Sequence, residues 1–217
     1  MTKLTKRLQT ILDELSPCET FADVGCDHGY IAESMLKNGK CNFAYVTDIS
    51  EKCLNKAVEL LLKNYKGKFK QIVTDGLKNV PKVDQVLIAG MGGENICEIL
   101  DSADFLPERM VLQPMKNSDK VRLKALTLGY KLIKDYTFKD EKYYDIIVCE
   151  KGKDFYTPDE LKYGRGNLLE KRKEFVEQIT ERLNVLQNSV PFMSEAEKIT
   201  VLAEIDHYVE LINFLKR

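Results

Sequence analysis

A short turn bounded by glycines carries the first residues that could do chemistry. Residues 25–29 (GCDHG) stand between a strand-like run at 21–24 and the start of a helix at 31–36. Such turns usually hold a nucleotide phosphate at the helix N-terminus. The dinucleotide fingerprint G-x-G-x-x-G fails here, because Asp27 and Tyr30 stand where it needs glycine, and a P-loop Gly-Lys-Ser/Thr is absent. The acid and the histidine therefore favour a ligand without phosphates.

S-adenosylmethionine is such a ligand, because it carries a sulfonium, an ammonium, a ribose diol and an adenine. Backbone amides at a helix start can hold its carboxylate, and acidic side chains suit its positive groups and hydroxyls. Asp27 is the carboxylate best placed for the sulfonium. Asp23, in the preceding strand, could instead orient the turn by accepting hydrogen bonds from its backbone.

Further acids follow the next strand-like runs. Asp48 ends the second run, 25 residues beyond Asp23, where an acid binds ribose hydroxyls in nucleoside-binding α/β folds. Asp75 ends the third run, where an acid can accept the adenine amino group, and residues 89–93 (AGMGG) end the fourth. Any one of these acids could simply cap a helix. Together at the carboxyl edge of one sheet they indicate a ligand site.

The elements that must position these residues alternate along the chain. An amphipathic helix is predicted at 3–15, and the helix-like segments that follow are 29–38, 51–65, 93–102 and 118–128. The strand-like runs are 20–25, 42–48, 68–74, 84–90 and 109–113, followed by 131–138 and 143–149, which read as an antiparallel hairpin. This order predicts an α/β, Rossmann-like fold with a seven-stranded, mostly parallel sheet.

The pattern changes after residue 150. Thr157 with Glu160, and Ser194 with Glu197, have the spacing of capping boxes, and Asn167 is predicted to open a long helix that ends at Pro191. Apolar residues three and four apart predict two antiparallel, coiled-coil-like helices over 167–217, with stripes at Val176, Ile179, Leu183, Leu186 and Val190, and at Ile199, Leu202, Ile205, Val209 and Ile212. We predict a first domain at 1–155 and a helical domain at 156–217. The tail either grips RNA or only packs on itself.

Composition narrows the classes of function. The chain of 217 residues is 44% hydrophobic and 31% charged with net charge −1, which argues against indiscriminate coating of nucleic acid. Six cysteines form no C-x-x-C pair and the two histidines are far apart, so no metal site is expected and the cysteines read as buried and reduced. The start lacks an apolar signal segment and no 18-residue apolar run occurs, so we expect a cytoplasmic protein without membrane contact.

Several motifs together resemble a known family. DVGCDHGY at 23–30, IAGMGG at 88–93 and LQP at 112–114 resemble the bacterial tRNA N1-methyltransferases that act on adenine 22. TKRLQT at 5–10 and YYDIIVCE at 143–150 extend the resemblance over nearly the whole chain. It implies a class I methyltransferase fold, S-adenosylmethionine as cofactor and tRNA as partner. Two departures are Ile31-Ala32 in place of Leu-Pro and Met115 in place of Asn, for which Asn117 could compensate.

The resemblance also implies site residues. Cofactor roles fall on the strand-end turns: Arg7, Asp23, Gly25, Asp27, His28, Gly29, Asp48, Ile49, Asp75, Gly76, Gly90 and Met91. Catalytic roles fall on Asp27, Met91 and Gln113, the last two as lining of the base pocket. From their residue types and positions, rather than from the resemblance, we expect contacts with tRNA at Tyr30, Pro114, Lys116, Tyr144, Lys171 and Arg172. Arg7 could reach the cofactor carboxylate or the RNA, and His28 could bond cofactor or base or only cap the helix.

The expected chemistry needs no general base. N1 of adenine already has an in-plane lone pair, so positioning supplies most of the rate, and a carboxylate such as Asp27 would stabilise the positive charge that develops. Asp27 could equally serve cofactor binding alone. The base must be unpaired or turned out, and Tyr30, Tyr143 or Tyr144 could stack on it. Two sets of cations could track the RNA backbone: Lys116, Lys120, Arg122 and Lys124, and Lys162, Arg165, Lys171, Arg172 and Lys173.

Alternatives remain open from the sequence. A methyltransferase of the same fold could act on a small molecule, or a degenerate methyltransferase fold could bind RNA or protein without catalysis. Retention of Asp27, Asp48 and Asp75 argues against the second alternative. We expect a monomer, with a homodimer through the tail as the other possibility.

Overall fold

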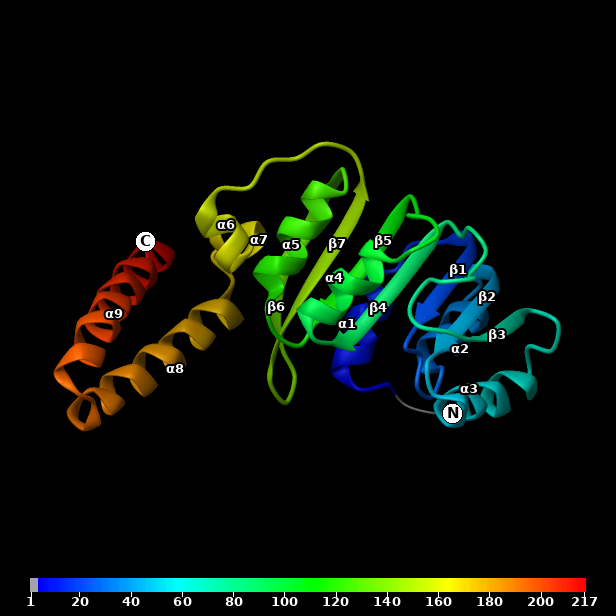
Figure 1. Cartoon of the computed structure of the whole chain (residues 1–217), viewed down its shortest axis with the longest axis horizontal. Helices are drawn as coiled ribbons and strands as arrows, with labels where there is room; N and C mark the ends of the chain where they lie inside the picture. Colours follow the sequence, from blue (N-terminus) through cyan, green and yellow to red (C-terminus); the bar gives the residue numbers. More distant parts are fainter. Residues whose placement is uncertain (1–3) are drawn as a thin grey trace.

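Seven strands form one sheet in the computed structural model, which describes residues 4–217 (Figure 1). The strand order is β3-β2-β1-β4-β5-β7-β6. The strands are β1 (Cys18–Val24), β2 (Cys41–Asp48), β3 (Phe69–Val73), β4 (Gln85–Met91), β5 (Arg109–Pro114), β6 (Tyr130–Lys139) and β7 (Tyr143–Lys151). The first five strands pair in parallel, and β7 pairs antiparallel with both β5 and β6. The predicted seven-stranded, mostly parallel sheet with a terminal hairpin is confirmed.

Helices cover both faces of the sheet, which is why the central strands are nearly continuous apolar runs. One face packs against α1 (Lys6–Glu14), α2 (Tyr30–Lys37) and α3 (Glu51–Leu62), with Ile11, Met35 and Leu54 in its core. The other face packs against α4 (Gly93–Asp101) and α5 (Ser118–Thr127), with Ile96 and Val121 in its core. Residue 3 of the predicted first helix lies outside the described residues.

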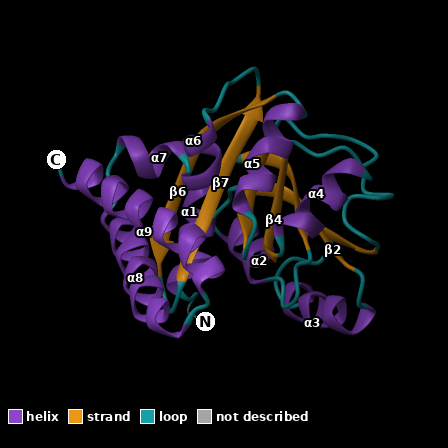
Figure 2. Cartoon of the chain, turned by 60° about the vertical axis from the view of Figure 1, so that its left-hand side comes forward, coloured by secondary structure: helices purple, strands orange, loops and turns teal. Residues whose placement is uncertain are grey.

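A helical hairpin extends from the β6 edge of the sheet (Figures 1 and 2). Two short helices, α6 (Pro158–Tyr163) and α7 (Arg165–Leu169), lead into α8 (Lys173–Ser189), the short 3-10 turn at Val190–Phe192, and α9 (Glu195–Lys216). Both predicted capping boxes are present, at Thr157 and at Ser194. The hairpin has a small core of its own, built around Phe175, Ile179 and Ile212.

Two details of the predicted tail are wrong. Asn167 does not open the long helix but lies fully buried within α7, where its amide oxygen accepts from Thr137 N at 2.8 Å and its amide nitrogen donates to Tyr163 O at 2.7 Å. The second apolar stripe is wrong at Ile199, which is 75% exposed, although Ile205 and Ile212 are buried as predicted. Tyr208, outside the predicted stripe, is buried in the same core, and the neighbouring His207 ring stacks on Tyr163 of α6.

Within residues 4–217, no helix combines the length and the hydropathy that crossing a membrane requires. In the same part of the chain, no group of three or more His, Cys, Asp or Glu side chains is placed to hold a metal ion. The predicted domain boundary at 155/156 falls in the segment between β7 and α6.

Candidate active site

The loop after β1 is held in a tight, mostly left-handed conformation. Gly25, Asp27 and Gly29 have φ values of 69°, 47° and 69°. The Gly25 and Cys26 backbone amides donate to Thr47 O at 2.8 and 3.0 Å, which ties the loop to β2. Asp23 accepts a 3.3 Å hydrogen bond from Ala32 N, so it also orients the start of α2. This contact fits the orienting role expected for Asp23.

Two adjoining hollows open at the carboxyl edge of the parallel strands. The first, here the Asp48 hollow, has a volume of about 390 Å³ and is lined by predicted residues that include Asp48, Ile49, Asp75 and Gly76. The second, here the Asp27 hollow, also has a volume of about 390 Å³, and its lining includes Arg7, Asp23, Asp27, His28 and Tyr30. Both are lined by Gly25, Ala89 and Gly90. The structure therefore brings most of the predicted cofactor residues around one divided site.

Met91 stands at the division between the hollows. The pairing of β4 with β5 shifts register between Ala89 and Met91, and Gly90 in that bulge has a φ of 79°. A Cβ on Gly25 would lie only 2.1 Å from Met91 Cε, so the thioether methyl packs directly on the glycine backbone. The bulge thus aims the Met91 side chain at the one place that both hollows share.

Arg7 reaches this division from α1. Its Nε donates a 2.8 Å hydrogen bond to Gln113 Oε1, its guanidinium lies 5.4 Å from the Tyr144 ring centroid, and its backbone amide donates to Asp140 Oδ2 at 2.8 Å. A Cβ on Gly90 would lie 2.8 Å from Arg7 Nη2. Burial lowers the pKa of Arg7. The guanidinium is therefore fixed against the backbone of the glycine loop.

Gln113 differs from its predicted place. Its side chain is fully buried and lines neither hollow, with Oε1 bound to Arg7 and Nε2 donating to Pro114 O at 2.9 Å. Gln113 therefore lines neither hollow in the structure, and its side chain instead holds Arg7 in position by a hydrogen bond. Met91, by contrast, lies in the wall of the Asp48 hollow.

Asp27 and His28 form a polar pair at the mouth of the Asp27 hollow. His28 Nδ1 lies 2.7 Å from Asp27 Oδ2, and Lys56 Nζ lies 3.7 Å from Asp27 Oδ1. The Asp27 side chain is 60% exposed, so its carboxylate stays accessible to a ligand. The rings of His28 and Tyr30 stack at 5.3 Å between centroids with 11° between their planes. These rings form a flat aromatic face beside the carboxylate.

Burial sets the electrostatics of the inner wall. It raises the pKa of Asp23 to about 7, although the hydrogen bond from Ala32 N acts in the opposite direction. Burial, together with the nearby charges of Asp23 and Asp48, also raises the pKa of Cys26. Cys26 is therefore a neutral thiol at neutral pH and no nucleophile.

The Asp48 hollow has a polar wall that the sequence analysis missed. Asn95, Glu98 and Ser102 line it from α4 and its C-terminal end. Their spacing of three and four residues is the signal that could have found them, because it places polar side chains on one helical face next to a glycine-rich strand end. Asp48 Oδ1 accepts a 2.8 Å hydrogen bond from Ser50 N, and the Ser50 side chain caps α3.

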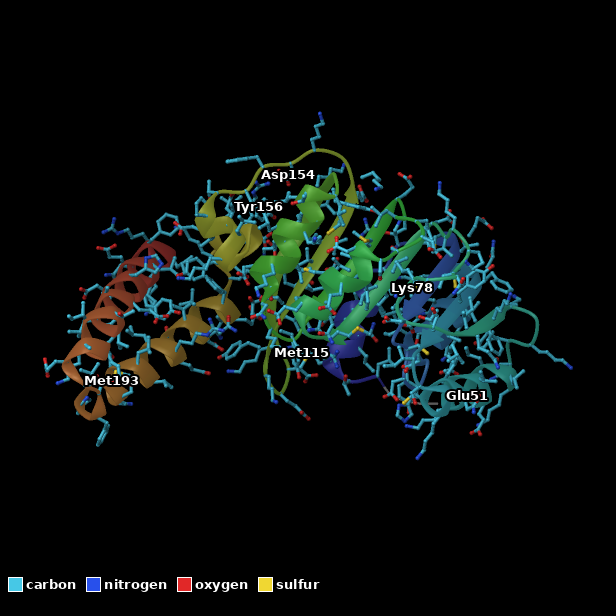
Figure 3. All side chains as sticks on the ribbon, viewed as in Figure 1. Glu51, Lys78, Met115, Asp154, Tyr156 and Met193 are labelled. Atoms are coloured by element: carbon cyan, nitrogen blue, oxygen red, sulfur yellow. The ribbon has the colours of Figure 1, made fainter. Side chains whose placement is uncertain are left out.

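The segment after β5 is bonded to the glycine loop after β4. Met115 N donates to Met91 O at 2.8 Å, and Gly93 N donates to Lys116 O at 2.9 Å. A Cβ on Gly93 would lie 2.3 Å from Asn117 O, so only glycine fits there. Met115 is 46% exposed and lies at the same edge of the sheet as the β6–β7 turn (Figure 3). Pro114 is buried and Lys116 is exposed beside it.

The other predicted RNA contacts are dispersed. Tyr144 lies under Arg7 and stacks on Phe138 at 5.6 Å. Arg172 lies over the Tyr136 ring and lines a separate hollow that has no residue in common with the two described above. Lys171 lies 5.7 Å from the Phe214 ring centroid. The structure does not bring Lys171 and Arg172 to the strand-end site.

The expected basic helix face is wrong in part. Arg122 has no exposed surface, and its Nε lies 2.9 Å from both oxygens of Asp135. Lys120 pairs with Glu94, Lys124 pairs with Asp101, and Arg165 pairs with Asp154 and Glu160. Sequence spacing could not distinguish the cations that face water from Arg122, which is buried and holds the sheet to α6.

Comparisons with known proteins agree with this geometry. The tRNA (adenine(22)-N(1))-methyltransferase of Bacillus subtilis (strain 168) is 29% identical over 207 residues, which cover 89% of this chain and 87% of that protein. The crystal structure of the B. subtilis M1A22 tRNA methyltransferase TrmK matches with a TM-score of 0.82 at 26% identity, covering 99% of each chain. M. capricolum TrmK, solved with S-adenosyl-homocysteine, matches with a TM-score of 0.88 at 22% identity and covers 99% of this chain and 100% of that one.

A family model described as a methyltransferase domain matches residues 4–147. These residues contain every strand-end loop of the divided site and all of the sheet except the last residues of β7. The match spans well over half of the chain. The chain therefore belongs to the methyltransferase domain family, with the class I, Rossmann-like fold that its sequence predicts.

Proposed function

We propose that this protein transfers a methyl group from S-adenosylmethionine to N1 of adenine 22 in tRNA. The observation that carries the proposal is the divided site, with Asp48 and Asp75 in one hollow, Asp27 in the other, and Gly25 between them. The B. subtilis relatives, which are named as methyltransferases of adenine 22, support the choice of acceptor. We further propose that the protein works in the cytoplasm as a monomer, without a metal ion.

The residues present fit S-adenosylmethionine. The Asp48 hollow suits the nucleoside, because Asp48 and Asp75 offer carboxylate oxygens to hydroxyl and amino groups. The Asp27 hollow suits the amino-acid part, because Asp23 and Asp27 would face its cations and Arg7 would face its carboxylate. A Cβ on Gly25, Gly76 or Gly90 would collide with Met91, Ile99 or Arg7, so these glycines let the walls of the hollows pack closely on the loops. When bound, the cofactor supplies an electrophilic methyl group.

The chain's own residues would supply orientation and charge. The stacked rings of His28 and Tyr30 offer a platform for a base turned out of the RNA. No proton has to be removed from adenine N1 before it reacts, so these contacts need only hold its lone pair in line. The Asp27 carboxylate would stabilise the positive charge that the adenine ring gains. Met91, packed on Gly25 Cα, would fix the place where the two hollows meet.

The test is methyl transfer from labelled S-adenosylmethionine to unmodified tRNA transcripts, with guanine-22 tRNA as the control substrate. Label only on adenine-22 tRNA supports the proposal. Asp27→Ala should lower the rate constant at saturating substrates by about 100-fold, the scale of one electrostatic contact in an active site. Label on another acceptor overturns the choice of adenine 22. No binding of the cofactor by calorimetry overturns the assignment as an enzyme.

The same experiment separates the two roles of Asp27. If the carboxylate acts on the developing charge, Asp27→Asn lowers kcat far more than it weakens cofactor binding. If it only binds the cofactor, the dissociation constant rises and kcat at saturation stays close to wild type. Lys56→Met is the matched control, because it removes the cation 3.7 Å from Asp27 without touching the carboxylate.

A further inference from the structure

A third, polar cavity lies where the sheet meets the tail. It has a volume of about 350 Å³ and is lined by residues from the segment after β5, from β7, and from α6 and α8. We call it the junction cavity and define it by Lys116, Asn117, Tyr143, Lys162, Gln178 and Arg182. It shares no residue with the Asp48 and Asp27 hollows. Of its tail residues, Lys162 is among the cations expected to track the RNA backbone, whereas Gln178 and Arg182 have no role assigned above.

Three cations from three different elements converge on this cavity. Lys116 follows β5, Lys162 belongs to α6 and Arg182 belongs to α8. Within residues 4–217, no carboxylate oxygen lies within 4.0 Å of any of the three, the distance that defines an ion pair. Such a cluster is costly without a counterion, because like charges repel where water is partly excluded.

Two carboxylates line the cavity beside the three cations, and a third, Glu181, lies outside the lining. Asp145 lines the cavity but accepts from Thr137 Oγ1 at 2.6 Å and lies 3.4 Å from Arg122 Nη2. Asp119, in the first turn of α5, is the other acid in the wall. Glu181 accepts from Tyr143 Oη at 2.6 Å. The lining itself therefore holds three cations and two carboxylates, of which Asp145 is already bonded to Thr137 and Arg122.

The chemistry of the wall matches a phosphate. Arg182 offers a planar fork of donors, the two lysines offer mobile charges, and the Gln178 amide adds a neutral donor. The segment that carries Lys116 is bonded to the methionine of the divided site, through Met115 N and Met91 O at 2.8 Å. The Lys116 stem also passes over Gly92, since a Cβ there would lie 3.3 Å from Lys116 Cε. The cavity is thus joined through Met115 and Lys116 to the Met91 wall of the Asp48 hollow.

We propose that the junction cavity binds a backbone phosphate of the RNA substrate, close to the target nucleotide. This inference rests on the proposed function and deepens it, because it makes α8 a direct contact of the RNA through Arg182. A phosphodiester held between Lys116 and Arg182 spans the segment after β5 and the tail. Placement of the tail against the sheet then decides which nucleotide reaches the divided site.

The experiment measures tRNA binding and methylation by the full chain carrying Arg182→Gln or Lys162→Gln. Arg217→Gln, at the exposed C-terminus, is the matched control for charge. Each cavity variant should raise KM for tRNA about tenfold, the effect of one lost charge-assisted contact. It should also reduce the slope of log Kd against log salt by about 0.7 to 0.9, as one phosphate contact is lost. Cofactor affinity and kcat should stay at wild-type values.

Three outcomes would contradict this inference, and each can be told apart from the others. Wild-type KM and salt slope in both cavity variants overturn the inference, and unchanged thermal unfolding midpoints show that the variants are folded. Calorimetry with inorganic phosphate tests the other source of the same chemistry: phosphate binding that Arg182→Gln abolishes, with tRNA binding unchanged, identifies a free-anion site and also overturns it. If the wild-type protein neither binds nor methylates tRNA, the proposed function falls first and this inference falls with it.

Discussion

Arg7 Nε donates a 2.8 Å hydrogen bond to Oε1 of Gln113, and this bond joins the first helix to the end of the fifth strand. Gln113 has no exposed surface, and its amide nitrogen donates a 2.9 Å hydrogen bond to Pro114 O. Its oxygen is therefore presented in a fixed direction to Arg7. The guanidinium in turn covers Gly90, one of the two glycines that line both hollows of the site.

We predict that Arg7→Met and Gln113→Leu weaken binding of S-adenosylmethionine through the same contact. A hydrogen bond to a charged group in a partly buried site is worth about 1.5–3 kcal/mol. The double variant should therefore bind the cofactor almost as well as the weaker single variant, with a coupling energy of about 1–2 kcal/mol by calorimetry. Lys6→Met, at an exposed position of the same helix, is the control. Fully additive losses would contradict the positioning role of Gln113.

A second prediction concerns Gly25 and Met91. Gly25→Ala places a methyl group 2.1 Å from Met91 Cε and forces a φ of 69° on alanine. The free energy of unfolding of this variant should therefore be lower than that of wild type by about 2–4 kcal/mol. Adding Met91→Ala removes the clash but not the backbone strain. The double variant should regain part of this loss in urea unfolding.

Cofactor binding separates packing from function at the same position. The added Cβ points at the place that Met91 Cε fills, and the φ of 69° stays strained in a loop that lines both hollows. The double variant should therefore still bind S-adenosylmethionine poorly although it is refolded. Met91→Ala alone is the control and should keep the fold. Recovery of wild-type cofactor affinity in the double variant would show that the space over Gly25 is not part of the site.

Most of the sheet was predictable from the sequence, and the reasons are local. Runs such as residues 20–25 and 84–90 are apolar because both faces of a parallel sheet are covered, and they end in glycine and acid where the chain turns. Thr157, Ser194 and Ser50 mark helix starts through their own side chains. These features depend on neighbours in sequence, so spacing alone reveals them.

Features that depend on distant partners were not predictable. Gln113 was expected to touch the base, but its partner Arg7 lies 106 residues away. Asn167 looked like a helix start because asparagine is a good cap, yet Thr137 in β6 uses its amide. Propensity favours the cap, and a buried hydrogen-bond network outweighs it. The spacing of the polar residues on α4 was visible in the sequence, but it could not be interpreted until the hollow beside the helix was known.

The pKa of Asp23 gives a third prediction, on stability against pH. Burial raises this pKa from 3.8 to about 7, so between these values the folded protein keeps a proton that the unfolded chain has released. The free energy of unfolding therefore falls as pH rises across this window, by at most about 1.4 kcal/mol per pH unit from this group. Asp23→Asn cannot titrate and can still accept the hydrogen bond from Ala32 N.

The measurement is urea unfolding of both proteins at several values between pH 4 and pH 8. The stability of Asp23→Asn relative to wild type should increase with pH up to about pH 7 and then level off. Asp206→Asn, an exposed change on α9, should show no such trend. Parallel curves for wild type and Asp23→Asn would mean that Asp23 is ionised in the folded protein throughout this range.

The last prediction concerns Arg122, which the sequence placed among cations facing RNA. In the structure it bridges the sheet to the segment that leads into the tail, with Nε 2.9 Å from both oxygens of Asp135 and Nη1 donating to Leu161 O at 3.1 Å. Arg122→Met leaves Asp135 buried without its cation, which costs about 3–5 kcal/mol. Arg122→Met with Asp135→Leu removes both charges and should restore much of the unfolding free energy in urea.

In the Arg122 and Asp135 variants, tRNA binding should depend on whether the protein is folded and not on the charge at residue 122. An RNA contact at Arg122 would leave the double variant stable but deficient in tRNA binding and with a reduced salt slope. If Arg122 is instead a structural bridge, the double variant should bind tRNA with the wild-type salt slope, because it again holds α6 and its Lys162 in place. Since Arg122 has no exposed surface, we expect tRNA affinity and salt slope to return together with stability.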